Sequence, residues 1–288
     1  AKKFFIELDI KVPDELDYIC GVILSKFENN EVDNEDLSSD FIVLLGYYQK
    51  VKDKSAGQDF INKVAEKIYL VDTNEILRHP SELYFYNKNL KSYFSARREI
   101  YYVDLDFYHL AVSEFGIDLV SLFISRLGVR RFPEIISVRR FSRWDLNERV
   151  RKQIPTVDSQ KSHFEDYELT GFTYALGLEY TIETSSYIWN ELLPAINFSK
   201  YENMTMVFRR KYARSYSTAY YTSTFKDYLM YCKWLFDKDG KRTSPEQIVL
   251  EDLAPEYNRN NGLIHFLNIE KREKSIVELG GTKEHQEQ

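Results

Sequence analysis

The sequence predicts an α+β fold that is predominantly helical, with two short hairpin–helix modules and small antiparallel sheets. Apolar residues recur at helical spacing over much of the chain, whereas alternation of apolar and polar residues is confined to short segments. In residues 233–248, Asp239-Gly240 lies between an apolar and a polar run, which is typical of a tight hairpin turn whose two central residues have positive φ. Ser244-Pro245 then provides a cap and a first-turn proline for a helix.

Residues 1–59 predict a strand followed by a helical subdomain. Apolar and polar residues alternate from 4 to 10, as in a strand with one buried face. Helical spacing follows over 16–27 and over 37–51. A shorter helical run over 60–68 leads into the next segment.

A hairpin followed by a helix start occurs twice, and we interpret residues 60–132 and 225–270 as two copies of one module. Residues 69–83 align with 234–248 at a constant offset of 165. The matched pairs are Leu70 with Leu235, Asp72 with Asp237, Asn74 with Asp239, Pro80 with Pro245 and Leu83 with Ile248. They are turn residues, the first-turn proline and the first buried helix residue, so the match falls on positions with a structural role. The first copy continues with a strand at 101–103 and with helices at 107–127 that are broken near Gly116.

The segment between the copies, residues 133–224, is predicted to contain a basic connection, a helical middle and a pair of strands. Residues 130–155 are basic and irregular. Residues 164–195 show helical spacing, first at Leu169, Phe172 and Leu176.

The strand pair is predicted at 206–221, where apolar residues alternate loosely. Thr222-Ser223-Thr224 then begins a helix over 225–232. At the other end of the second module, residues 271–288 are polar and predict a flexible tail.

Length and composition indicate a chain that can bury a core and form two or three subdomains. Its 288 residues are 43% hydrophobic and 15% aromatic, within the range of globular proteins. The net charge of −6 argues against a protein whose whole surface binds nucleic acid, although it leaves a local basic patch open.

Several features predict a cytoplasmic protein. Cys20 and Cys232 are the only cysteines, too few for a disulfide framework or a cysteine zinc site, which fits a reducing compartment. No window approaches the roughly 18 apolar residues of a membrane span, and the first residues lack a signal-peptide pattern, so we expect no membrane partner. The chain begins Ala1-Lys2-Lys3 and enters strand-like sequence at once, and we therefore expect a fragment of a longer polypeptide.

The sequence predicts no catalytic residue, no cofactor and no metal site. It lacks the G-x-S-x-G, P-loop and strand-linked G-x-G-x-x-G motifs. The turn Asp237-Lys238-Asp239-Gly240 lacks the third acidic ligand of a calcium loop, and Ile248 stands where a bidentate Glu is needed. The five histidines are scattered along the chain. Paired carboxylates such as Asp104 and Asp106 are more typical of helix caps than of a general acid and base.

A basic cluster is the candidate nucleic-acid or phosphate-binding site. Segment 126–152 carries nine positive charges against three negative ones, with Phe132, Phe141 and Trp144 interleaved. Arginine beside aromatic rings suits phosphate contact and base stacking. Together with a second patch at 209–214, the candidates are Arg130, Arg131, Arg139, Arg140, Arg143, Arg149, Arg151, Lys152, Arg209, Arg210, Lys211 and Arg214. The alternative is that these side chains bridge to acidic residues of the same protein or to a neighbouring domain.

Short motifs follow one another between residues 60 and 270. They are Pro80-Ser81-Glu82-Leu83-Tyr84, Tyr102-Val103-Asp104, Leu127-Gly128-Val129, Asp166-Tyr167-Glu168-Leu169-Thr170-Gly171-Phe172, Ser185-Ser186-Tyr187-Ile188-Trp189 and Trp234-Leu235-Phe236-Asp237-Lys238-Asp239-Gly240. Their order resembles sacsin-like multidomain proteins, in the region that follows the GHKL-type ATP-binding domain, especially in large bacterial homologues. Phe236 departs from the proline that is more usual there, and residues 1–59 lie outside the likeness.

The resemblance implies a non-catalytic structural and interaction region of a larger sacsin-like, chaperone-like or defence-associated ATPase. The asparagine-bearing helix motif and the D-x-G-x-G loop of such ATPases have no counterpart here, so we expect no enzyme activity from this fragment. The implied partners are other domains of the same polypeptide and separate proteins. The alternative is a nucleic-acid-binding module that uses segments 126–152 and 209–214, and it predicts binding that weakens as salt rises.

Overall fold

The computed structural model describes residues 14–29, 32–95, 97, 99–146, 148–154, 162–177, 180–196, 205–211 and 216–269. The predicted strand at 4–10 and the predicted tail at 271–288 lie outside these residues. The fold is α+β and predominantly helical, with several small antiparallel sheets, which confirms the predicted fold class. The chain divides into two compact units: unit 1 comprises Ala1–Asn87 and Arg98–Arg131, and unit 2 comprises Lys88–Arg97 and Phe132–Gln288.

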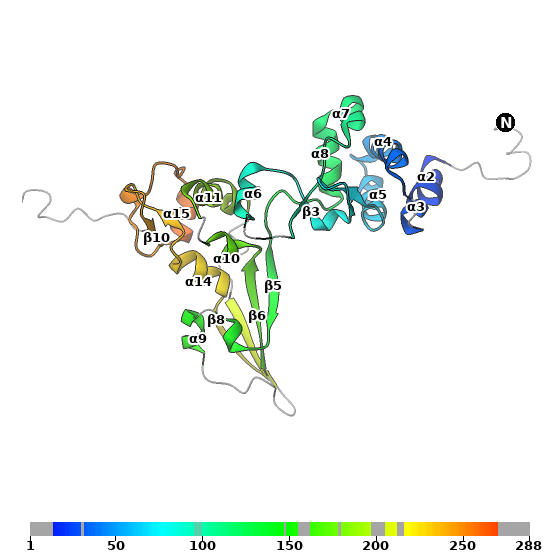
Figure 1. Cartoon of the computed structure of the whole chain (residues 1–288). Helices are drawn as coiled ribbons and strands as arrows, with labels where there is room; N and C mark the ends of the chain where they lie inside the picture. Colours follow the sequence, from blue (N-terminus) through cyan, green and yellow to red (C-terminus); the bar gives the residue numbers. More distant parts are fainter. Residues whose placement is uncertain are drawn as a thin grey trace, which may run out of the picture. The chain divides into compact units, whose positions relative to one another are not determined.

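Unit 1 packs helices and short strands around one core. Its helices are α2 (Glu15–Tyr18), a π-helical stretch (Ile19–Ile23), α3 (Leu24–Glu28), α4 (Asn34–Val51), α5 (Ser55–Ala65), α7 (His109–Phe115) and α8 (Ile117–Arg126). They confirm the helices predicted at 16–27, at 37–51 and on both sides of Gly116, and Figure 1 shows them grouped together. Phe41 and Leu44 of α4 and Phe123 of α8 are fully buried in the shared core, because apolar residues at helical spacing form one face of each helix.

The short strands of unit 1 form two pairs. They are β1 (Leu70–Val71), β2 (Leu77–Arg78), β3 (Leu83–Tyr84) and β4 (Tyr101–Tyr102), with a 3₁₀ turn (Pro80–Glu82) before β3. β1 and β2 are antiparallel, and β3 and β4 are parallel. Leu70, Val71 and Leu83 are buried in the same core as the helices, so the hairpin and the helical segment before it fold as one body.

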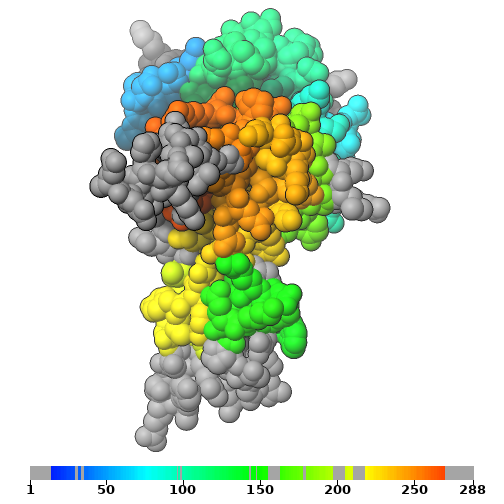
Figure 2. Space-filling model, turned by 90° about the vertical axis from the view of Figure 1, so that its left-hand side faces the viewer, coloured from blue at the N-terminus to red at the C-terminus, as the bar shows by residue number. Residues whose placement is uncertain are grey.

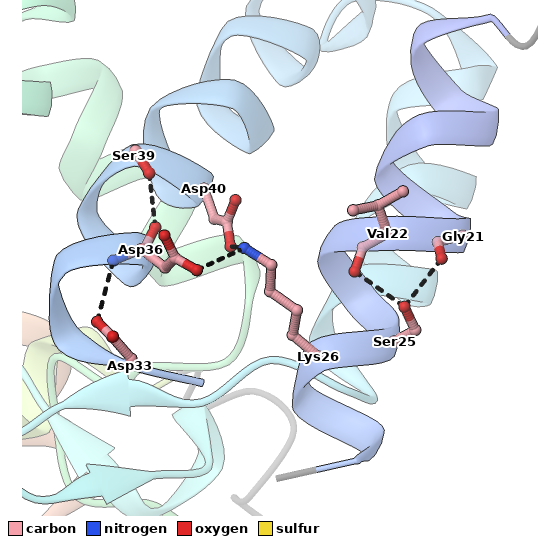
Figure 3. Close-up of polar contacts among 8 residues, drawn as sticks. All are labelled: Gly21, Val22, Ser25, Lys26, Asp33, Asp36, Ser39 and Asp40. Carbon is pink, nitrogen blue, oxygen red and sulfur yellow. Dashed lines mark hydrogen bonds and ion pairs between the residues drawn. The ribbon is translucent and has the colours of Figure 1, made fainter. Parts of the chain in front are cut away.

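An ion pair joins α3 to α4 within unit 1. Lys26 Nζ lies 2.8 Å from Asp40 Oδ2 and 3.1 Å from Asp36 Oδ2 (Figure 3). Hydrogen bonding to Asp40 raises the pKa of Lys26 above its ordinary value. Since Asp40 is nearly buried, the ammonium group compensates for its desolvation.

Unit 2 contains a four-stranded antiparallel sheet in the order β5-β6-β7-β8. The strands are β5 (Ile135–Arg140), β6 (Ser162–Leu169), β7 (Thr205–Lys211) and β8 (Tyr216–Thr222). Helices α9 (Glu148–Gln153) and α14 (Thr224–Tyr231) lie on one side of the sheet (Figure 1). Val150 of α9 packs there against Phe164, Met206 and Phe208. Figure 2 shows α9 in green beside the yellow strands.

Strands β7 and β8 confirm the strand pair predicted at 206–221, but two neighbouring predictions are wrong. Residues 130–155, predicted to be irregular, contain β5 and α9, and residues 164–169, predicted to be helical, belong to β6. β6 pairs with β5 on one side and with β7 on the other. These pairings join residues far apart in the sequence, so the spacing of apolar residues within β6 does not reveal them. The apparent helical spacing instead crosses the end of β6, a turn at Gly171 with φ of 82° and the short helix α10 (Phe172–Ala175).

The rest of unit 2 surrounds a second apolar centre. Its elements are α6 (Lys88–Tyr93), a 3₁₀ turn (Arg143–Asp145), α11 (Ile182–Tyr187), a π-helical stretch (Ile188–Leu192), α12 (Leu193–Ala195), β9 (Leu235–Phe236), β10 (Arg242–Thr243), a 3₁₀ turn (Leu250–Asp252) and α15 (Asn261–Phe266). Trp189 and Trp234 are buried with their ring centroids 6.3 Å apart. The indole N–H of Trp234 donates to the carbonyl of Leu229, and that of Trp189 donates to the carbonyl of Asn258, both at 2.8 Å, so both buried indoles have a hydrogen-bond partner.

The hairpins β1–β2 and β9–β10 have the same hydrogen bonds at equivalent positions. Asp72 Oδ1 accepts from the N–H groups of Asn74 at 2.8 Å and Ile76 at 3.0 Å. Asp237 Oδ1 accepts from those of Asp239 at 3.0 Å and Lys241 at 2.8 Å. The matched aspartates are therefore turn formers in both hairpins, because each side chain satisfies two backbone donors of its own turn.

A buried tyrosine hydroxyl completes each hairpin, which the sequence alignment did not indicate. Tyr108 Oη accepts from the N–H of Val71 at 3.1 Å, and Tyr257 Oη accepts from the N–H of Phe236 at 2.8 Å. Burial raises the pKa of Tyr108, and it raises that of Tyr257 to about 12. Both hydroxyls therefore stay neutral at physiological pH.

Two local predictions around these turns are wrong. Gly240, with φ of 76°, has positive φ but Asp239 does not, so the turn has one left-handed residue rather than two. The N–H of Gly240 donates to the carbonyl of Asp237, as in a three-residue hairpin loop. After β10, Ser244 accepts N–H bonds through its carbonyl from Gln247 and Ile248, but the chain forms a single turn there and no helix.

Glu75 occupies the position equivalent to Gly240, with φ of 61°. We expect Glu75→Gly to stabilise unit 1 by about 0.5–1 kcal/mol, because glycine removes the left-handed penalty but has a more mobile unfolded state. We expect Gly240→Ala to destabilise unit 2 by about 1–2 kcal/mol. A Cβ at Gly240 would have no atom within 4 Å, so the cost is conformational only. Urea unfolding of both variants tests this, and effects of the same sign would contradict it.

Candidate functional site

The candidate site is the sheet face turned away from α9 and α14, which we call the open face. Strand register places Arg139, Glu165, Val207 and Tyr220 in one row, because each residue is paired with the next across the four strands. At the usual strand separation the row is about 14 Å long. Phe164, the neighbour of Glu165, packs on the covered side, as alternation along a strand requires.

A second row of the open face holds His163, Arg209 and Thr218. Phe141 follows the end of β5, and its ring centroid lies 6.5 Å from that of His163. The side chain of Phe141 is 62% exposed and that of Tyr220 is 68% exposed. Two exposed rings and two arginines therefore share one face of the sheet.

Glu165 is the electrostatic centre of the open face. Its Oε1 lies 3.0 Å from Arg209 Nε, 3.5 Å from His163 Nε2 and 3.8 Å from an Arg139 terminal nitrogen. Burial acts to raise the pKa of Glu165, but the hydrogen bond and charge of Arg209 outweigh it, and the pKa lies below its usual value. One carboxylate thus faces two guanidinium groups, so the charges of Arg139, Glu165 and Arg209 sum to a net positive charge.

Arg140 belongs to the other face of the sheet. Its Nε lies 3.1 Å from Asp166 Oδ2, and a terminal nitrogen lies 3.2 Å from Glu168 Oε2. The side chain of Arg140 is only 18% exposed, and that of Asp166 is fully buried. Acidic residues of the same sheet therefore hold this guanidinium group.

The candidates on α9 are also bonded within unit 2. Arg149 Nε lies 3.4 Å from Asp227 Oδ1, and its guanidinium carbon is 3.2 Å from the ring centroid of Tyr231. The guanidinium carbon of Arg151 lies 4.6 Å from the ring centroid of Trp144. Lys152 pairs with Glu148 on the same helix at 2.8 Å. Since α9 covers the opposite side of the sheet, none of these groups belongs to the open face.

Arg130 and Arg131 belong to unit 1. Arg130 donates to the hydroxyl of Tyr84 at 3.4 Å, and the guanidinium carbon of Arg131 lies 4.7 Å from the ring centroid of Phe85. The side chains of Arg143, Arg210 and Lys211, and the whole of Arg214, lie outside the described residues. Among the candidates with a described side chain, the structure brings Arg139 and Arg209 together on one face.

Five members of the two rows on the open face were absent from the sequence candidates: His163, Glu165, Val207, Thr218 and Tyr220. No alternation of apolar and polar residues marks β6, because Asp166 and Glu168 occupy inward-facing positions of this strand. Which residue of β8 joins the row depends on register, and a single strand does not specify it.

A cavity of about 310 Å³ also lies in unit 2. Its lining includes Arg140, Glu168, Phe172, Tyr174 and Tyr228. Burial raises the pKa of the Tyr228 hydroxyl. The charged side chains of the lining are Arg140, Asp145 and Glu168, one positive against two negative, so the lining does not favour an anionic ligand.

The described residues contain no group of three or more His, Cys, Asp or Glu side chains that could hold a metal ion. No helix in that part of the chain is both long and apolar enough to cross a membrane. No family model, curated protein or solved structure matches this chain.

Proposed function

We propose that this chain is a non-catalytic structural and interaction region of a larger sacsin-like, chaperone-like or defence-associated ATPase. The order of the short motifs supports the family. The repeated hairpin supports a structural role, because four ionisable side chains accept hydrogen bonds from its backbone: Asp72 and Asp237 in the turns, and Tyr108 and Tyr257 at the strands. The partners are other domains of the same polypeptide and separate proteins of the cytoplasm.

We expect the purified chain to show no magnesium-dependent ATP hydrolysis. Phosphate release is measured across the fractions of a gel-filtration run, beside a mock preparation from cells that do not express the chain. Circular dichroism of the same fractions establishes that the chain is folded. Turnover that follows the protein peak and is absent from the mock preparation would contradict a non-catalytic role.

The family assignment has its own test. The complete reading frame that encodes this chain is expected to contain a GHKL-type ATP-binding domain before residue 1. A reading frame without such a domain would contradict the sacsin-like assignment, whatever the result of the hydrolysis assay.

A nucleic-acid or phosphate-binding module that uses segments 126–152 and 209–214 is the second candidate function. The observation that favours it is the open face, where Arg139 and Arg209 lie with the exposed rings of Phe141 and Tyr220. Such a module binds nucleic acid with an affinity that falls as salt rises.

A further inference from the structure

We infer that the open face binds single-stranded nucleic acid, with Arg139 and Arg209 on phosphates and Phe141 and Tyr220 stacked on bases. The inference rests on the second function proposed above and narrows it to one surface. It leaves out Arg140, which is held on the opposite face by Asp166 and Glu168.

The two arginines have N–H donors that a ligand can reach. Arg209 uses Nε for Glu165, and among the described residues its terminal nitrogens have no hydrogen-bond partner. The side chain of Arg139 is 58% exposed and touches the same carboxylate only at 3.8 Å. Glu165 therefore orients Arg209 by a hydrogen bond and attracts Arg139 by charge, without neutralising both groups. A planar guanidinium group oriented in this way matches the paired oxygens of a phosphate.

The two rings supply the second part of the recognition. A single exposed aromatic residue is common on protein surfaces. Phe141 and Tyr220, however, are both more than 60% exposed and stand on the same face as the two arginines. Aromatic rings beside a positive surface are the arrangement on which the bases of single strands stack.

The shape of the face favours a single strand over a duplex. A row across the four strands is about 14 Å long at the usual strand separation, wider than the roughly 12 Å major groove of B-DNA. Bases in a duplex are also stacked on one another, so the rings would have no partner. An acidic peptide would engage the arginines but not the rings, and the test below separates it from a nucleic acid.

The test titrates the full 288-residue chain into labelled single-stranded DNA or RNA and measures the fluorescence anisotropy of the label. The probes are about 12 nucleotides long, within the range of site sizes known for single-strand-binding surfaces. A duplex of the same length and an acidic peptide of equal charge serve as competitors. The variants on the open face are Arg139→Gln, Phe141→Ala and Tyr220→Thr, the last of which keeps a strand-forming residue. The matched controls are Lys233→Gln and Tyr174→Ala, exposed residues that lie outside the four strands of the sheet.

We expect each ring substitution to weaken binding by about 5- to 150-fold, the range that stacking of one base provides. Arg139→Gln is expected to reduce the slope of log affinity against log salt by about 0.7, the value for one phosphate of a single strand. The two controls are expected to bind as the unmodified chain does, and the single strand is expected to displace probe better than the duplex or the peptide. Circular dichroism of each variant separates loss of binding from loss of fold.

Two failures can be told apart. If neither the labelled single strands nor a labelled duplex binds at low salt, both the open-face site and nucleic-acid binding by the second proposed function are wrong. If the strands bind but only the double variant Arg130→Gln/Arg131→Gln weakens the complex, nucleic-acid binding stands and the open-face site is wrong. Equal losses in the controls, or displacement by the peptide as strong as by the single strand, would likewise overturn the inference.

Discussion

Replacing Asp166 with alanine is expected to lower the free energy of unfolding of unit 2 by about 3–5 kcal/mol, the usual cost of removing one partner of a buried ion pair. The Asp166 side chain is fully buried, and its Oδ2 lies 3.1 Å from Arg140 Nε. Its Oδ1 accepts from the N–H of Thr224, the first residue of α14, at 2.9 Å. Alanine would leave both donors inside the protein without their acceptor.

Urea unfolding followed by tryptophan fluorescence measures this effect, because Trp144, Trp189 and Trp234 all lie in unit 2. Glu168→Gln is the matched control. Glu168 also contacts Arg140, at 3.2 Å, but its side chain is 31% exposed, so we expect a loss below about 1 kcal/mol. Equal losses from the two substitutions would show that burial of Asp166 is not what makes the contact strong.

The ion pair between Asp166 and Arg140 explains why β6 was not predicted from the sequence. The inward-facing positions of this strand whose side chains the structure describes are Phe164, Asp166 and Glu168, and two of these three are acidic. A strand with one buried face normally shows apolar residues at such positions. Arg140 compensates for the burial of these carboxylates by pairing with them. Because Arg140 lies on a different strand, a pattern within β6 does not reveal this pairing.

The repeat was predictable only where its loops have equal length. Asp72 and Asp237 align at the constant offset because the turns themselves are equally long. Tyr108 and Tyr257 have equivalent bonds but stand at a different offset, since the first copy has a longer connection that includes α6. For the candidate site, the sequence indicated arginines beside aromatic residues. It did not separate Arg139 from Arg140, because that depends on which side of a sheet each faces.

Replacing Asp72 with alanine is expected to destabilise unit 1 by about 3–5 kcal/mol, far more than Asp237→Ala destabilises unit 2. The Asp72 side chain is fully buried, and its Oδ2 lies 2.6 Å from Arg78 Nε. The guanidinium carbon of Arg78 also lies 3.3 Å from the ring centroid of Tyr101. Asp237 makes the same turn but is partly exposed, and loss of its two backbone bonds is expected to cost about 1–2 kcal/mol.

Hydrogen exchange of a peptide that spans residues 68–80 measures the loss in unit 1, and the tryptophan signal measures the loss in unit 2. Each substitution is compared with the unmodified chain. Losses of similar size in the two turns would contradict the view that the buried ion pair, rather than the shared turn, gives Asp72 its larger effect.

The stabilisation from Asp72 is also expected to depend on pH. Burial acts to raise the pKa of Asp72, but Arg78 and the N–H donors of Ile76 and Asn74 outweigh it and hold the pKa below its usual value. A carboxyl group with a lower pKa in the folded state stabilises fully above its unfolded pKa, about 3.9, and loses this effect as pH falls through the folded value.

Asparagine has no such titration. The difference in unfolding free energy between the unmodified chain and Asp72→Asn should therefore shrink below about pH 4, as measured by urea unfolding at a series of pH values. A difference that stays constant down to about pH 2 would show that the charge of Asp72 adds nothing to its hydrogen bonds.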